Sequence, residues 1–256
     1  MVKDTLQKKN KIILELKNVS FSFDNTIVLK NISLDIVTGD FVGLIGPNGS
    51  GKTTLLKIIL KILPRQSGTI KINKISLDKF NDWARIGYVP QKATSIETQF
   101  PATVSEVVAM GLLSTKKFPK LITKNDNEKI INALQLVKMT EFKNRRIGEL
   151  SGGQQQRILI AKAMISEPEI LFLDEPTTGV DQESQKNFYE LLGKLNTEGT
   201  TIVLVSHDVG KITRYVTKIA SLNQHLEFYG THKEFCANDQ KHKHDYHSHN
   251  LCLDRG

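Results

Sequence analysis

Apolar residues follow two different periods along the chain, and together these periods predict strands that alternate with helices. Alternating or continuous apolar runs predict strands at residues 12–23, 28–37, 40–45, 68–72, 85–89, 170–173 and 201–205. Apolar residues three and four positions apart predict helices at residues 54–63, 103–113, 125–139, 151–165 and 182–195. The strand at 170–173 is apolar throughout, as in a sheet covered on both faces, and the strand at 201–205 is expected to be a second buried strand. The pattern therefore predicts an α/β domain with a parallel sheet.

Changes in composition along the chain predict how it is organised. Residues 1–10 are polar and predict a flexible leader before a main domain at residues 11–236. The mostly helical run from about 92 to 160 predicts a helical subdomain inserted into the sheet domain. Residues 237–256 are polar and rich in histidine, which predicts a tail outside the domain.

The overall composition excludes several classes of protein. Of the 256 residues, 39% are hydrophobic and 24% are charged, which is ordinary for a globular protein and argues against wholesale disorder. The net charge of +8 permits a nucleic-acid partner, but the lysines are scattered rather than massed, so no such partner is expected. No signal peptide and no run of about 20 apolar residues is present, so we expect no membrane-spanning helix.

A phosphate-binding loop follows the strand at 40–45. Residues 46–53 read Gly-Pro-Asn-Gly-Ser-Gly-Lys-Thr, which fits the pattern G-x-x-x-x-G-K-[ST]. A chance glycine turn is the alternative, but the preceding strand and the following helix are the context that the motif requires. Backbone N–H groups of such a loop cradle phosphate, a lysine adds positive charge and a hydroxyl binds Mg²⁺. The expected nucleotide-binding residues are Gly46, Pro47, Asn48, Gly49, Ser50, Gly51, Lys52, Thr53 and Thr54.

Two carboxylates end the apolar strand at 170–173. Asp174 is expected to bind Mg²⁺ through water, together with Thr53, and Glu175 is expected to polarise the water that attacks the phosphate. An ordinary acidic strand end is the alternative. It is less favoured here because the chain also carries a phosphate loop.

The segment Ser151-Gly152-Gly153-Gln154 predicts a second phosphate-facing helix start. Ser151 and Gln154 have the spacing of a capping box, so a well-capped helix alone would explain them. The two glycines remove side chains from the helix start, which lets an anion approach the backbone. Since one phosphate loop is already present, this second start suggests a site shared between two subunits.

These motifs occur in the order found in one family. Leu150 to Gln154, placed between a phosphate loop and Leu173-Asp174-Glu175-Pro176, resembles the ATPase subunit of ABC transporters over roughly residues 12–235. The resemblance implies a P-loop NTPase (RecA-like) parallel sheet core, an N-terminal antiparallel β subdomain and an inserted α-helical subdomain. It also implies ATP and Mg²⁺ as cofactors.

The resemblance assigns roles to four further residues. Gln91 matches the glutamine that contacts Mg²⁺ and the attacking water, and His207 matches the histidine that contacts the γ-phosphate. Asp181 lies in a loop expected to cross the dimer interface at the nucleotide. Phe23 stands where the family often has a tyrosine that stacks on adenine, and phenylalanine keeps the aromatic face. The expected catalytic set is therefore Lys52, Gln91, Glu175 and His207.

The resemblance also implies partners and a location. Two copies are expected to face head to tail, with each ATP between the phosphate loop of one copy and residues 151–154 of the other. The expected partners are a second copy, integral-membrane permease subunits and, indirectly, an extracytoplasmic metal-binding protein. The protein is then expected at the cytoplasmic face of the cell membrane.

Two features bear on the cargo. Within the family, residues 41–57, 177–181, 205–210 and 213–216 look most like importers of zinc or manganese. The tail adds four histidines, which would suit zinc better than manganese: His242, His244, His247 and His249. A polar tail with no metal role explains these histidines equally well.

Several alternative functions remain open from the sequence. An importer of manganese, iron or an iron chelate would share the same motifs, and some exporters are also split into separate subunits. A soluble ABC-type ATPase acting on nucleic acid or ribosomes is less favoured, because the chain has neither a long coiled coil nor a second ATPase unit. A non-catalytic regulatory copy would usually lack Lys52, Glu175 or His207, and all three are present.

Overall fold

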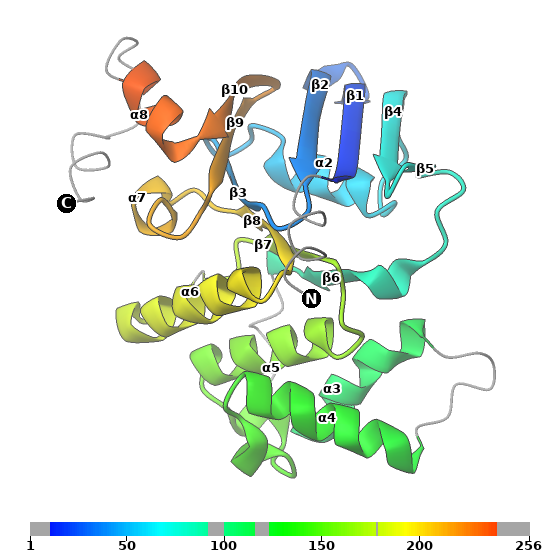
Figure 1. Ribbon diagram of the computed structural model, residues 1–256, viewed down its shortest axis with the longest axis vertical. Coiled ribbons are helices and arrows are strands. Elements are labelled where there is room, and N and C mark those ends of the chain that lie inside the picture. Colours follow the sequence, from blue (N-terminus) through cyan, green and yellow to red (C-terminus); the bar gives the residue numbers. More distant parts are fainter. Residues whose placement is uncertain (1–10, 92–99, 116–122, 178, 240–256) are drawn as a thin grey trace, which may run out of the picture. The chain divides into compact units, whose positions relative to one another are not determined.

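The computed structural model describes residues 11–91, 100–115, 123–177 and 179–239 (Figure 1). The chain divides into two compact units. The first combines the residues up to Phe80 with those from Thr201 onward, and the second comprises Asn81–Thr200. Among the described residues, no helix has the length and apolar character needed to cross a bilayer.

Two sheets build the first unit. One is antiparallel, with strands in the order β2-β1-β4-β5. In the other, β3 pairs in parallel with β8 on one side and with β9 on the other, and β10 pairs antiparallel with β9. The strands are β1 (Ile12–Phe23), β2 (Thr26–Val37), β3 (Phe41–Ile45), β4 (Ser67–Ile72), β5 (Ile75–Ser76), β8 (Thr201–Val205), β9 (Lys218–Asn223) and β10 (His225–Thr231).

The helices of the first unit are α2 (Lys52–Ile59), α7 (Val209–Ile212) and α8 (His232–Asp239). Every residue of β3 and β8 is buried, which confirms the prediction of a buried strand at 201–205. The apolar pattern did not predict β5, β9, β10, α7 or α8. The predicted antiparallel sheet at the start of the chain and the parallel strands that follow it are both confirmed.

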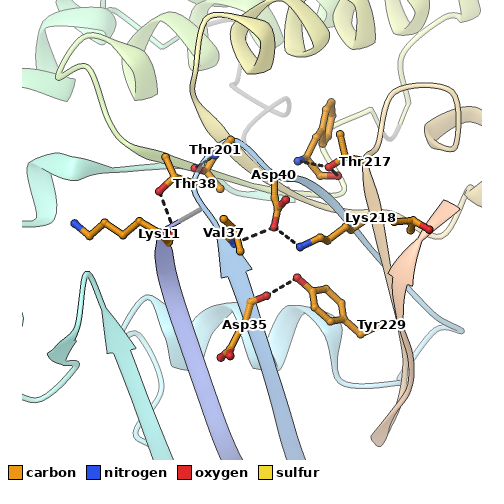
Figure 2. A network of polar contacts seen from close by, with 12 residues as sticks. Lys11, Asp35, Val37, Thr38, Asp40, Thr201, Thr217, Lys218 and Tyr229 are labelled. Atoms are coloured by element: carbon orange, nitrogen blue, oxygen red, sulfur yellow. Dashed lines mark hydrogen bonds and ion pairs between the residues drawn. The ribbon is translucent and has the colours of Figure 1, made fainter. Parts of the chain in front are cut away.

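A polar network joins the two sheets within the first unit (Figure 2). The Tyr229 hydroxyl of β10 donates a hydrogen bond to the Asp35 carbonyl of β2 at 2.6 Å. The Lys218 ammonium of β9 pairs with the Asp40 carboxylate at 2.9 Å, and the same carboxylate oxygen accepts the Val37 N–H at 2.9 Å. Asp40 therefore fixes the end of β2 and the start of β9 beside the first residue of β3.

The second unit contains a parallel strand pair and most of the helices. Strand β6 (Ile86–Val89) pairs in parallel with β7 (Ile170–Asp174), and β7 is buried throughout. The helices are α3 (Val104–Ala109), α4 (Lys124–Leu136), α5 (Gly152–Met164) and α6 (Gln182–Thr197). Helices α3, α4 and α5 contact one another, and α5 also contacts β6 and α6 (Figure 1).

One predicted helix differs in detail. The helix expected at 103–113 is α-helical only over Val104–Ala109, and Met110–Ser114 continue it as a 3₁₀ helix. Here Gly111 packs so closely on α5 that an added Cβ would lie 2.0 Å from the Lys162 carbonyl oxygen. The predicted helical subdomain at about 92–160 falls inside the second unit, and its boundaries stay a prediction.

Candidate active site

The phosphate loop connects β3 to α2. Strand β3 ends at Ile45 and α2 begins at Lys52, so the motif occupies the turn between a buried strand and a helix start. Gly51 is the N-cap with a φ of 97°, a left-handed conformation that glycine adopts without strain. The first turn of α2 carries no acidic residue. The positive end of the helix dipole is therefore not neutralised by its own side chains, which favours an anion there.

Backbone packing from a neighbouring turn holds the loop. An added Cβ on Gly46 would lie 2.1 Å from the Leu222 carbonyl oxygen, so only glycine fits at that position. Gln224, in the turn between β9 and β10, donates its N–H to the Ser50 carbonyl at 3.1 Å. The Gln224 carbonyl accepts the Lys30 N–H of β2 at 2.7 Å. The turn thus ties the loop to the antiparallel sheet, a role that no sequence signal assigns to Gln224.

Lys52 folds its side chain back over the loop that precedes it. Its ammonium donates hydrogen bonds to the carbonyl oxygens of Gly46 at 2.9 Å and Pro47 at 2.8 Å, and the residue is only 5% exposed. Thr53 and Thr54 follow in the first turn of α2 and are partly exposed. The loop therefore presents one buried cation and two hydroxyls at a helix start, a combination suited to binding phosphates and a hard cation.

The remaining loop residues differ in exposure. Pro47, Asn48 and Gly49 are exposed, whereas Ser50 is 3% exposed and lies under the loop. Three of the residues predicted to meet the nucleotide are thus accessible, whereas Ser50, which was also predicted, is buried within the loop.

His207 follows β8, the strand next to β3. Leu44 of β3 is in register with Val205 of β8, and the Ser206 N–H donates to the Leu44 carbonyl at 3.2 Å. Both strands end at the same edge of the sheet because they run in parallel. The structure therefore brings exposed His207 to the edge from which the phosphate loop emerges.

Phe23 lies at the end of β1 and is 50% exposed. Its ring meets the buried Phe21 ring edge-on, with centroids 4.8 Å apart. Its strand partner is Thr26 of β2, two residues before Val28, and an added Cβ on Gly51 would lie 2.8 Å from the Val28 carbonyl oxygen. The exposed aromatic ring is thus on a hairpin that also contacts the phosphate loop.

In the second unit, β6 and β7 bring three predicted site residues to one edge. Val89 is in register with Leu173, so Gln91 follows one strand where Asp174 and Glu175 end the other. The Gln91 side-chain amide donates to the Glu175 carboxylate at 3.0 Å, across 84 residues of sequence. The two side chains that the sequence analysis placed beside the attacking water are in direct contact.

Asp174 and Glu175 occupy different surroundings. Asp174 is 1% exposed, and Glu175 is partly exposed with a φ of 43°, which is unusual for a residue other than glycine. Burial, followed by the nearby Asp174 carboxylate, raises the pKa of Tyr88 on β6 to about 12. The buried Asp174 suits a charged ligand of metal, and the more accessible Glu175 suits proton transfer to water.

The start of α5 has the predicted capping box. The Ser151 hydroxyl accepts the Gln154 N–H at 3.3 Å, and the Gln154 side-chain oxygen accepts the Ser151 N–H at 3.0 Å. The two glycines between them differ in surroundings. An added Cβ on Gly152 would meet nothing within 4 Å, whereas one on Gly153 would lie 2.7 Å from the Ser184 hydroxyl. Ser151 and Gly152 are exposed, so this helix start is accessible to another molecule.

Asp181 is the N-cap of α6. Its carboxylate accepts the Ser184 N–H at 2.9 Å, and this backbone hydrogen bond is the main cause that lowers the pKa of Asp181. The capping role alone explains why an acidic residue stands there. The predicted role at a nucleotide is compatible with it, since Asp181 is exposed.

The four tail histidines predicted as a weak zinc site lie outside the described residues. Among the residues that the structure does describe, no group of three or more His, Cys, Asp or Glu side chains is arranged to hold a metal ion.

Comparison with known proteins gives a consistent result. Residues 29–178 match the family model described as ABC transporter. The chain is 49% identical to the zinc uptake system ATP-binding protein ZurA of Listeria monocytogenes over 226 residues, which is 88% of each chain. It is 40% identical to the manganese transport system ATP-binding protein MntB of Halalkalibacterium halodurans, covering 85% of this chain and 86% of that one.

A solved structure adds to this likeness. The ATP-binding cassette MJ0796, in a dimeric post-hydrolysis state bound to ADP and Pi, superposes with a TM-score of 0.72 at 30% identity. The match covers 85% of this chain and 98% of that one. The predicted P-loop NTPase fold class is confirmed.

Proposed function

Because this chain belongs to the ABC transporter family of ATP-binding proteins, we propose that it hydrolyses ATP to drive uptake of a transition metal, foremost zinc. ATP binding and hydrolysis are properties of this family. The choice of cargo is supported by one observation, the 49% identity to a zinc uptake ATP-binding protein over 88% of the chain. Manganese is the second candidate, because a relative named for manganese transport is 40% identical.

The side chains already described would divide the chemistry among them. Lys52 would hold the β- and γ-phosphates together with the backbone of the loop, and His207 would contact the γ-phosphate. Glu175 would accept a proton from the attacking water, with its carboxylate oriented by Gln91 at 3.0 Å. This contact is the observation that best supports hydrolysis, because it holds the proposed base in one orientation.

Mg²⁺ fits the donors that the chain offers. The Thr53 hydroxyl, the Gln91 amide oxygen and the Asp174 carboxylate are all hard oxygen ligands, which Mg²⁺ prefers. The Asp174 carboxylate lies at the end of β7, and only 1% of the residue is exposed. When bound, Mg²⁺ would neutralise charge on the phosphates, and Thr53, Gln91 and Asp174 would hold it.

Pairing of two copies follows from the accessible start of α5. Ser151 and Gly152 are exposed, and an added Cβ on Gly152 would meet nothing within 4 Å, so this helix start can receive the phosphates of an ATP held by a second copy. The 30% identical cassette is described as dimeric. We propose that this chain also forms a dimer, paired head to tail, with Phe23 stacking on adenine and Asp181 near the interface between the two copies.

The proposed assembly includes membrane permease subunits, so the protein would act at the cytoplasmic face of the membrane. An extracytoplasmic metal-binding protein would deliver the cargo to the permease. ATP binding would close the pair of ATPase subunits and hydrolysis would open it, which supplies the two states that transport requires.

Growth of a deletion strain tests the cargo. Cells that lack this chain should grow poorly in medium depleted of metals by a chelator, and added zinc should restore growth at lower concentration than added manganese. The wild-type chain supplied in trans should remove the defect, and Lys52→Ala should not. Rescue by manganese but not by zinc would reverse the proposed order of cargoes.

A further inference from the structure

Three glutamine side chains of the second unit, two of them buried and one partly exposed, donate to the backbone of neighbouring loops. They are Gln155 and Gln156 of α5, which are 5% and 1% exposed, and Gln185 of α6. Among the described residues, the side-chain oxygen of each has no hydrogen-bond partner. Burying a glutamine side chain whose carbonyl oxygen has no hydrogen-bond partner costs free energy. The hydrogen bonds that the amide N–H groups do make must therefore contribute to the structure.

The three amides reach different segments. Gln155 donates to the carbonyls of Ile147 and Leu150, both at 3.2 Å, just before Ser151. Gln185 donates to the carbonyls of Thr177 at 3.2 Å and Val180 at 2.8 Å, in the loop before Asp181. Each glutamine thus fixes a loop that carries a predicted site residue.

Gln156 reaches the segment that carries Glu175. Its side-chain amide donates to the Pro176 carbonyl, the residue directly after Glu175. Proline has no N–H, so the carbonyl is the only backbone group through which Pro176 can be held by a hydrogen bond.

The backbone of Glu175 needs such support. Its φ of 43° is in the left-handed region, which residues other than glycine adopt only when the surroundings hold them there. On one side of Glu175 lies Asp174, the buried last residue of β7. On the other side lies Pro176, which Gln156 holds from α5. Its carboxylate is oriented separately, by Gln91.

The geometry points to Gln156 as a positioning residue for Glu175, an inference that rests on the proposed role of Glu175 in ATP hydrolysis. Gln156 fixes the Pro176 carbonyl and thereby the strained backbone that aims the Glu175 carboxylate. Because α5 also begins with residues 151–154, the same helix connects the proposed second phosphate site to the proposed general base. Without Gln156, ATP would still bind, but Glu175 would be misaligned with the attacking water.

A double-mutant cycle with Glu175 tests this role. Gln156→Leu keeps a side chain of similar size and removes the donor, and Gln156→Met serves if Leu impairs folding. The turnover number of purified protein at saturating ATP should fall about 10²-fold, as expected for a misplaced catalytic group, with KM for ATP within about twofold of wild type. In the Glu175→Gln background, measured by single turnover, Gln156→Leu should lower the residual rate no further.

Gln155→Leu is the matched control, since it removes an equally buried amide from the same helix. Gln155→Leu should lower the rate of ATP hydrolysis by the same factor in the wild-type and the Glu175→Gln backgrounds. The reason is that the carbonyls bound by Gln155 lie in the segment before Ser151. An equal loss from Gln156→Leu in both backgrounds, or no loss in either, would overturn the positioning role. If Glu175→Gln itself hydrolyses ATP at the wild-type rate, the proposed role of Glu175 as general base fails, and this inference fails with it.

Discussion

At the scale of single residues, Phe23 shows how an exposed side chain is held in place. The Ser22 N–H donates to the Gln66 side-chain oxygen at 2.6 Å, and the Gln66 amide donates to the Ser22 carbonyl at 2.8 Å. Gln66 thus continues the pairing of β1 beyond the last β1–β4 pair, Ser20 with Ser67. The Phe21 and Phe23 rings also pack edge to face. These contacts hold the exposed Phe23 ring in one position.

Replacing Phe23 tests whether that face binds the base. Phe23→Ala should weaken ATP binding about tenfold, because stacking of a base on an aromatic ring contributes roughly 1–3 kcal/mol. Phe23→Tyr keeps the face and should bind like wild type. Affinity can be measured by displacement of a fluorescent ATP analogue. Tripolyphosphate, which lacks a base, should bind all three proteins equally, and a matching loss for tripolyphosphate would show that Phe23 only supports the loop.

How far single residues could be predicted depended on whether their role is local. The capping box of Ser151 and Gln154 was predicted from spacing and is present, because its hydrogen bonds join residues three apart. Gln156 and Gln224 were not predicted. Gln156 reaches Pro176 with its side chain and Gln224 reaches Ser50 with its backbone N–H, and both partners are distant in sequence. Neither the residue type nor the local spacing indicates which carbonyl will be the partner.

At the scale of elements, the start of α5 shows two adjacent glycines with different functions. An added Cβ on Gly153 would lie 2.9 Å from the Ser184 Cβ and 2.7 Å from its hydroxyl, so Gly153 lets α5 and α6 approach. Gly152 has open space around it and is exposed, so packing does not require glycine there.

Alanine at each position should therefore have opposite effects. Gly153→Ala should destabilise the fold by about 1–3 kcal/mol through overpacking, visible as a lower melting temperature. Gly152→Ala should melt at or above the wild-type temperature, since alanine favours a helix by roughly 0.5–1 kcal/mol. It should nonetheless weaken ATP-dependent pairing of two copies, seen by gel filtration, because the methyl group blocks the anion. Normal pairing of Gly152→Ala would argue against a phosphate at this helix start.

Strand β10 is joined to β2 through Tyr229, and this contact predicts a pH dependence. Burial, followed by the carboxylates of Asp40 and Asp35, raises the pKa of Tyr229 above its ordinary value. The folded state therefore keeps the proton at a pH where the unfolded chain has lost it. The stabilisation is complete below pH about 10, the ordinary pKa of tyrosine, and is lost progressively as the pH rises above it.

Tyr229→Phe isolates this contribution. It should cost about 1 kcal/mol at neutral pH through the lost hydrogen bond to the Asp35 carbonyl. Between pH 10 and 11 the melting temperature of the variant should fall less steeply than that of wild type. If the melting temperatures of the two proteins fell equally over that range, Tyr229 would not be the cause of the loss of stability at alkaline pH.

Strands and helices with strong apolar periods were predictable, and the weaker ones were not. Strands β3, β7 and β8 are buried throughout, and each was predicted from a short, largely apolar run. Strand β9 contains Lys218, Ser221 and Asn223 among its six residues, so its pattern resembles a loop. It becomes a strand because β3 and β10 pair with it on both sides.

At the scale of the whole molecule, the candidate site is distributed over distant parts of the sequence. The first unit gathers the phosphate loop, Phe23 and His207, and the second gathers Gln91, Asp174 and Glu175 with the start of α5. The sequence alone could assign Gln91 and His207 only through the family resemblance, since neither has a local motif. Within its own unit, each follows the end of a parallel strand, Gln91 after β6 beside β7 and His207 after β8 beside β3.

The central claim is that this chain hydrolyses ATP with Glu175 as the general base, in a pair of copies closed by ATP. The most direct measurement is phosphate release by purified wild type and Glu175→Gln, with the mass of each determined in the presence of ATP. We predict turnover by wild type, a rate about 10²–10⁴-fold lower for Glu175→Gln, and an ATP-dependent dimer that persists only in the variant. Equal rates for the two proteins, or a Glu175→Gln variant that stays monomeric at saturating ATP, would contradict the account.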